Sequence, residues 1–189
     1  IRGLQPGGDD GSYFQTFQLT TGSKVGPGNE LFLGSKALSF RDDFLPFRFS
    51  SSLEVNTPLV FAGYGITAPE MHWDDYRGVD VTDKIVVVFR HEPQELDEES
   101  PFNGSEMTSH ASFMSKTVNA KQHGAKAIIF ILDPNNHSDS EQALLATTDR
   151  SAKDNSGIAA FYVRSEPIIS YFLERGYDLS AIQSHIDTN

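Results

Sequence analysis

Two short segments hold residue types that could do chemistry, and the first is a glycine-rich turn. Residues 63–68 follow an apolar run and read Gly-Tyr-Gly-Ile-Thr-Ala, which fits the G-x-G-x-x-A pattern of dinucleotide-binding sites. That chemistry needs a helix whose amino terminus meets the pyrophosphate, and Pro69 leaves room only for a brief turn. We therefore expect the two glycines to permit a sharp chain reversal where side chains would clash.

The second segment, residues 91–95, begins like the H-E-x-x-H motif of zinc hydrolases. Its fifth position is Glu95 rather than histidine, and Pro93 interrupts the helix that the motif requires. The six histidines of the chain form no His-x-His pair and no histidine pair at i, i+4 spacing, so each is expected to be a surface or capping residue. The sequence thus predicts a solvated loop here, with no metal ligand and no cofactor-binding residue in the chain.

A group of acidic residues lies within residues 92–106. Its members are Glu95, Asp97, Glu98 and Glu99. Carboxylates do acid–base or metal work only where burial or a nearby charge shifts their pKa values, so a solvated polar loop is the expected state. The sequence also lacks G-x-S-x-G, S-x-x-K and any glycine–lysine pair, and no catalytic residue is predicted.

The elements that would position these segments are mainly strands. The strongest signals are the apolar runs 59–62, 84–89, 127–132 and 159–163. Continuous apolar strands are typical of sheets that are buried on both faces. Weaker patterns predict a strand over 13–19, a hairpin of 30–33 with 36–40, and an edge strand or loop around Pro46.

Helices are fewer. One is expected over 109–123, capped by Thr108 or Ser109 and closed by Gly124 in a left-handed turn. A second begins at Ser165, tolerates a proline in its first turn and ends at Gly176, and a short third helix covers 180–186. A helix, a glycine and then a buried strand form half of a βαβ crossover, and the pattern as a whole predicts an α/β or α+β domain.

Composition limits the function classes. The chain has 189 residues, enough for about one domain, and 15 basic against 26 acidic residues give a net charge of −11. That charge argues against nucleic acid and against an anionic membrane surface as partners. The absence of cysteine excludes disulfides, thiolate metal sites and thiol nucleophiles. Because the chain starts at Ile1 and shows no signal sequence, we expect it to begin partway through a longer product or after processing.

Two longer motifs carry a family resemblance. Residues 59–66, followed by 74–76 and 80–88, form the first motif, and Lys116 with residues 120–130 forms the second. Together they resemble the protease-associated (PA) domain, in the version inserted in di-zinc aminopeptidases of peptidase family M twenty-eight. The resemblance implies a swivelling β/β/α domain of the α/β class, with two packed β layers and a few flanking helices on one side.

The same resemblance implies a division of the chain. Residues 1–20 would be a connector from the parent peptidase domain, 21–175 the PA domain, and 176–189 the return towards the peptidase domain. The peptidase half of the family carries the metal ligands and catalytic residues, and neither the Glu98-Glu99 pair nor Asp154 stands in the context that those ligands require. The expectation is therefore no catalytic, metal or cofactor residue here, and zinc in the parent peptidase domain.

The implied function is that of a non-catalytic domain that lies beside the active site of a secreted or periplasmic aminopeptidase. Its partners would be the parent peptidase domain in cis and a peptide or protein substrate, with no nucleic acid and no membrane. Loops 92–106 and 133–156 are the expected substrate-access elements, since binding residues concentrate on loops. The acidity of Glu95, Asp97, Glu98 and Glu99 would favour substrates with a positive amino terminus.

Two alternatives remain open. One is a free-standing peptide- or protein-binding module of the sorting-receptor type. The other is a hydrolase that uses an unrecognised site.

Overall fold

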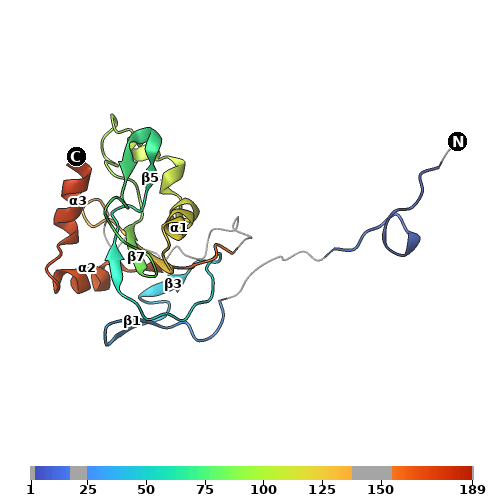
Figure 1. Cartoon of the computed structure of the whole chain (residues 1–189), viewed down its shortest axis with the longest axis horizontal. Coiled ribbons are helices and arrows are strands. Elements are labelled where there is room, and N and C mark those ends of the chain that lie inside the picture. The colour runs from blue at the N-terminus through green and yellow to red at the C-terminus, as the bar shows by residue number, and fades with distance from the viewer. Residues whose placement is uncertain (1–2, 18–24, 138–154, 189) are drawn as a thin grey trace.

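The computed structural model describes residues 3–17, 25–137 and 155–188, which centre on a five-stranded sheet (Figure 1). The sheet order is β3-β9-β8-β7-β4; β4, β7, β8 and β9 run parallel, and β3 pairs antiparallel to β9 at one edge. The strands are β3 (Phe44–Pro46), β4 (Leu59–Phe61), β7 (Ile85–Phe89), β8 (Ala127–Ile131) and β9 (Ala159–Val163). The four apolar runs are thus confirmed as strands, and the segment around Pro46 is confirmed as an edge strand.

Helices cover both faces of this sheet, which explains why its central strands are apolar throughout. Alternate residues such as Val86 and Val88 pack with α1 (Phe113–Gln122), while Val87 and Phe89 pack with α2 (Ser165–Leu173) and α3 (Leu179–Thr188). Figure 1 shows α1 and α3 on opposite sides of β7. The α/β class is confirmed, but the expectation that the helices lie on one side is wrong, because two buried faces each need a covering element.

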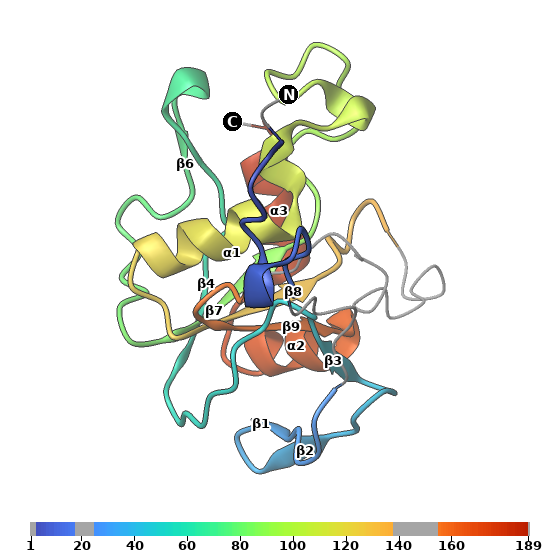
Figure 2. The same ribbon diagram turned by 90° about the vertical axis from the view of Figure 1, so that its right-hand side faces the viewer.

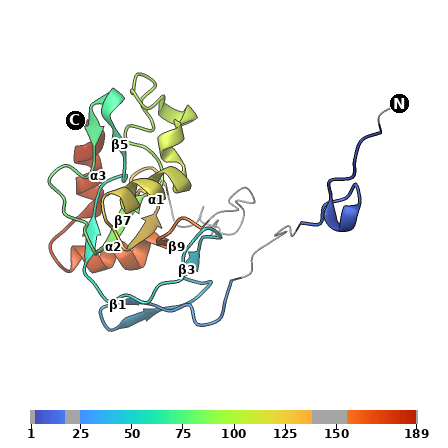
Figure 3. The same ribbon diagram turned by 45° about the vertical axis from the view of Figure 1, so that its right-hand side comes forward.

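Two small antiparallel sheets pack against the central sheet. They are the hairpin β1 (Leu31–Leu33) with β2 (Lys36–Leu38), and β5 (Thr67–Ala68) with β6 (Trp73–Asp74). Leu33, Leu38 and Ile66 share a buried cluster with the α2 and α3 face of the central sheet. This confirms the predicted hairpin and the packing of two β layers, and Figure 3 shows the hairpin at one end of the molecule.

The helix boundaries follow from local capping. The predicted helix 109–123 divides into a 3-10 turn (Ser109–Ala111) and α1, because Ser112 is extended and its hydroxyl caps α1 by accepting the Ser115 N–H. Gly124, at φ +88°, closes α1 as expected. The remaining short helices are 3-10 turns at Asp9–Gly11, Pro69–Met71 and Gly104–Glu106. No described helix has the length and apolar character needed to cross a bilayer.

The amino-terminal segment does not form the predicted strand in its described part. Residues 13–17 pair with no other described strand, and the side chains of Tyr13, Phe14 and Phe17 are exposed. Residues 18 and 19 of that prediction lie outside the described residues. Figures 1 and 3 show the segment projecting away from the body of the domain, and in Figure 2 it points towards the viewer. Its alternating residues therefore have no neighbouring sheet edge with which to pair.

Candidate functional site

Four polar side chains meet where the central parallel strands β7 and β8 end. Phe89 of β7 pairs with Ile131 of β8, so the residues that follow both strands emerge at the same edge of the sheet. His91 and Glu95 come from the loop after β7, and Asp133 and His137 come from the segment after β8. The carboxyl ends of parallel strands are where α/β proteins place ligands.

The four side chains form one compact cluster. His91 Nδ1 lies 2.6 Å from Asp133 Oδ1 and 3.7 Å from Glu95 Oε2. His137 Nε2 lies 2.9 Å from Glu95 Oε2 and 3.7 Å from Asp133 Oδ2. One ligand atom from each residue falls within 4.8 Å of all the others.

The cluster is buried and charged. Asp133 is fully buried, His91 and Glu95 are 7% and 8% exposed, and only His137 is partly open to solvent. Two carboxylates that share so small a space require positive charge nearby, from imidazolium or from a cation. Asp133 Oδ2 has no hydrogen-bond partner among the described residues although it is buried.

A buried lysine holds the end of β7 beside this cluster. Lys116 comes from α1, is 1% exposed, and its Nζ donates to the carbonyl oxygens of Phe89 (2.8 Å), Arg90 (2.7 Å) and His91. Burial lowers the pKa of Lys116 to about 7, and the nearby carboxylates of Asp75 and Glu92 act against that decrease. The lysine thus fixes the backbone from which His91 projects.

Asp75 anchors the glycine turn that follows β4. Its carboxylate accepts the Ile66 N–H at 2.9 Å, and burial raises the pKa of Asp75 to about 6. A Cβ on Gly63 would lie 2.5 Å from Asp75 Oδ1, and one on Gly65 would lie 2.7 Å from Val88 Cγ1. The predicted chain reversal is confirmed, and β5 with a 3-10 turn follows it rather than a helix for a pyrophosphate.

The loop of residues 92–106 is divided between the interior and the solvent. Glu92 is fully buried and accepts the Thr108 N–H at 2.6 Å together with the Thr108 hydroxyl, which closes the base of the loop. Glu95 also points inward, to His137, whereas Asp97, Glu98 and Glu99 are exposed. The expectation of a solvated loop over 91–95 is therefore wrong, because these side chains partner groups at the end of β8.

The helix α3 ties the glycine turn to the same loop. Asp187 accepts the Tyr64 hydroxyl at 2.9 Å and the Gln94 N–H at 3.1 Å. Burial raises the pKa of Tyr64, with Asp187 adding to the increase. Gln183 of α3 accepts the Asn135 N–H at 2.9 Å, so one helix face holds three loops at the strand ends.

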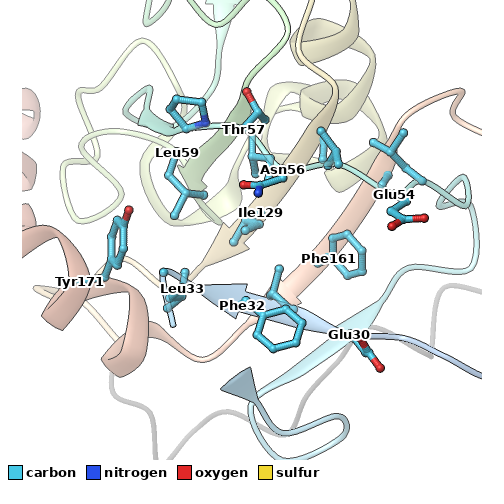
Figure 4. A pocket seen from close by; sticks show the side chains of 18 of the residues that line it. Glu30, Phe32, Leu33, Glu54, Asn56, Thr57, Leu59, Ile129, Phe161 and Tyr171 are labelled. Atoms are coloured by element: carbon cyan, nitrogen blue, oxygen red, sulfur yellow. The ribbon is translucent and has the colours of Figure 1, made fainter. Parts of the chain in front are cut away.

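A separate hollow lies at the opposite end of the sheet, beneath the β1–β2 hairpin. Its volume is about 1300 Å³, and Figure 4 shows Leu33, Leu59, Ile129, Phe161 and Tyr171 around it. Ile85, Ala127 and Ala159, the first residues of their strands, also line it. The hollow and the polar cluster therefore occupy different ends of the molecule.

Glu95 is a residue predicted from the sequence, whereas its partners His91, Asp133 and His137 are not. The signal was present: His91 with Glu95, and Asp133 with His137, are both i, i+4 pairs that follow a buried strand. A search for histidine pairs alone overlooks mixed pairs of histidine and carboxylate. The predicted grouping of Glu95 with Asp97, Glu98 and Glu99 separates in space, and their predicted role in substrate access stays a prediction. The second predicted access loop, 133–156, lies outside the described residues from 138 to 154.

Comparison with known proteins identifies the domain. No curated protein gives a match. Among solved structures, the chain is similar to the aminopeptidase from Aneurinibacillus sp. strain AM-1, at 22% sequence identity and a TM-score of 0.48. That similarity covers 76% of this chain and 27% of the aminopeptidase chain. The family model of the PA domain matches residues 55–167, more than half of the chain, and the chain therefore belongs to the PA domain family.

Proposed function

We propose that this chain is the non-catalytic PA domain of a zinc-dependent aminopeptidase of peptidase family M twenty-eight, where it shapes substrate access beside the active site. Membership of the PA family carries the proposal, because both motifs that resemble the peptidase version of the domain fall in its core. The first makes β4 and the glycine turn, and the second makes α1 and β8. The partner is the peptidase domain in cis, which holds the catalytic zinc, and the parent enzyme is secreted or periplasmic.

The exposed apolar side chains of the amino-terminal segment support a docked partner. Leu4, Tyr13, Phe14 and Phe17 are each at least 67% exposed. Clustered exposed apolar residues mark surfaces that another protein covers. In the proposed enzyme, this segment packs against the peptidase domain.

The three exposed carboxylates of the 92–106 loop support a role in access. Asp97, Glu98 and Glu99 project into solvent from a loop whose base is fixed by Glu92 and Thr108. A fixed acidic loop at a cleft raises the local concentration of substrates with a positive amino terminus.

Charge neutralisation in the full-length enzyme tests this role. The triple variant Asp97→Asn, Glu98→Gln, Glu99→Gln should raise KM several-fold at low salt and leave kcat unchanged, and added salt should reduce the difference. The matched control neutralises Asp80, Asp83 and Glu174, which are exposed on other parts of the surface. An unchanged KM, or an equal increase in the control, would contradict the access role.

The isolated chain tests the absence of catalysis. We expect no aminopeptidase turnover by the purified chain, with or without added zinc. Turnover that depends on zinc would favour the self-sufficient hydrolase and overturn the proposal.

The hollow beneath the β1–β2 hairpin favours one alternative, a peptide-binding module of the sorting-receptor type. It is large enough for a ligand and carries apolar side chains with Glu30 and Glu54 at its border (Figure 4). Titration calorimetry of the isolated chain with varied peptides separates the two functions, because saturable heat would support the module and its absence would oppose it.

A further inference from the structure

We propose that His91, Glu95, Asp133 and His137 bind one divalent transition-metal cation of the zinc type, which joins the loop after β7 to the segment after β8. The inference stands apart from the proposed function, because it concerns a structural ion within this domain rather than the zinc of a peptidase domain. It reverses the sequence-based prediction that the chain contributes no metal ligand.

The geometry of the cluster suits a small four-coordinate ion. Donors arranged tetrahedrally at about 2.0–2.1 Å from zinc lie about 3.3–3.4 Å from one another. The four histidine–carboxylate separations run from 2.6 to 3.7 Å, and one ligand atom from each residue lies within 4.8 Å of all the others. Side-chain shifts of about 1 Å would bring the four donors to the spacing of a tetrahedral site.

The donor set selects the class of cation. Two imidazole nitrogens with two carboxylate oxygens suit Zn²⁺ and neighbouring transition metals, whereas Mg²⁺ and Ca²⁺ take oxygen ligands almost exclusively. The two carboxylates supply two negative charges, which one divalent ion balances. Because four side chains are available, the site is closed in the manner of structural zinc sites rather than open for catalysis.

An unpartnered buried atom points to the same ligand. Asp133 is fully buried, and its Oδ2 accepts no hydrogen bond from the described residues although Oδ1 lies 2.6 Å from His91 Nδ1. A buried carboxylate oxygen without a donor is costly, and coordination to a cation satisfies it. His137 Nε2, 3.7 Å away, faces this oxygen.

The backbone around the cluster is fixed before any ion binds. Lys116 holds the carbonyl oxygens of residues 89–91, and Gln183 holds the Asn135 N–H between Asp133 and His137. Preorganisation of this kind reduces the entropy lost on binding.

Metal titration of the full chain tests the inference. After treatment with a chelator and its removal, Zn²⁺ should bind with one-to-one stoichiometry by calorimetry and raise Tm. Co²⁺ should give the visible absorption of a tetrahedral complex, and Mg²⁺ and Ca²⁺ should give no comparable heat.

Three variants locate the site. His137→Gln and Asp133→Asn should each weaken Zn²⁺ binding by about tenfold or more and abolish the cobalt spectrum. His110→Gln is the matched control, since it removes another histidine–carboxylate contact, 2.8 Å from Glu70, outside the cluster. If Asp133→Asn does not fold, His137→Gln decides the question, because its side chain is partly exposed.

The outcomes are distinct from those of the access role. Absence of one-to-one Zn²⁺ binding, or wild-type affinity in His137→Gln, overturns the metal site and identifies the cluster as a hydrogen-bonded group of histidines and carboxylates. Neither result alters the KM test in the full-length enzyme.

Discussion

Lys116 and Asp75 show how single buried charges organise the strand ends. All three protons of the Lys116 ammonium find carbonyl acceptors at the end of β7, while Asp75 accepts the Ile66 N–H in the glycine turn. The two pKa values move in opposite directions, because burial disfavours the charged form of each group. Both side chains are buried because they satisfy backbone groups at the strand ends, and neither is assigned a catalytic role.

The raised pKa of Asp75 predicts a pH effect on stability. The folded carboxyl keeps its proton up to about pH 6, whereas an unfolded aspartate releases it near its ordinary value of 3.8. The folded state therefore binds more protons between these values, and wild-type stability should decrease by about 2–3 kcal/mol, relative to Asp75→Asn, as pH rises from about 4 to about 7. Urea unfolding at both pH values measures the difference.

Asp80→Asn provides the control for this effect. Lys84 and the Thr82 N–H hold the pKa of Asp80 down to about 2, so its contribution is lost only as pH falls below the ordinary value. Above about pH 4, the free energy of unfolding of Asp80→Asn should therefore change with pH in the same way as that of the wild type. If the free energy of unfolding of Asp75→Asn has the same pH dependence as that of the wild type, burial does not raise the pKa of Asp75.

The glycine turn between β4 and β5 leaves little room for a larger side chain. Gly65 has φ +71° and faces Val88 Cγ1, while Gly78 has the similar φ of +77° in open space. Gly65→Ala should destabilise the domain by about 1–3 kcal/mol more than Gly78→Ala, because only the former adds a steric clash to the shared backbone strain. Denaturant midpoints compare the two, and equal losses would contradict the close packing of Gly65 on β7.

Elements were more predictable than the site they position. The run over 84–89 is β-branched and continuous, so its strand could be inferred locally, and the glycine turn could be inferred from the two glycines alone. The two i, i+4 pairs of the cluster are visible in the sequence, but their meeting is not, because His91 and Asp133 are 42 residues apart and meet through the register of β7 with β8. The strand predicted over 13–19 failed in its described part for a related reason: alternation does not supply a partner strand.

At the scale of the whole molecule, the main feature is the order of the strands across the central sheet. Across the sheet, the parallel strands β4, β7, β8 and β9 lie side by side in chain order, and only the antiparallel β3 falls outside that order. Dinucleotide-binding folds place their crevice where the order of the parallel strands reverses, and the described parallel strands have no such point. The sheet presents loops at one end, and the β1–β2 hairpin lies at the other (Figure 3), with the hollow beneath it.

The hydrogen bonds of α3 predict how readily this helix separates from the rest of the domain. Tyr64→Phe removes the hydroxyl that donates a hydrogen bond to Asp187, which should lower the free energy of unfolding by about 1–2 kcal/mol. Amide hydrogen exchange within residues 179–188 should increase as a result. Tyr177→Phe, at a side chain that is 58% exposed, should leave the exchange of α3 unchanged. Exchange of α3 that is unchanged in Tyr64→Phe would show that the helix is held by its apolar face alone.

The carboxylate of Asp187 has a mechanical consequence. This single side chain, in the last turn of α3, accepts hydrogen bonds from both the Tyr64 hydroxyl and the Gln94 N–H. Displacement of that turn would therefore displace both the chain reversal after β4 and the acidic loop. The two bonded residues, Tyr64 and Gln94, are thirty positions apart in the sequence. In the proposed enzyme, movement of a partner packed against α3 would thereby be transmitted to the loop that carries Asp97, Glu98 and Glu99.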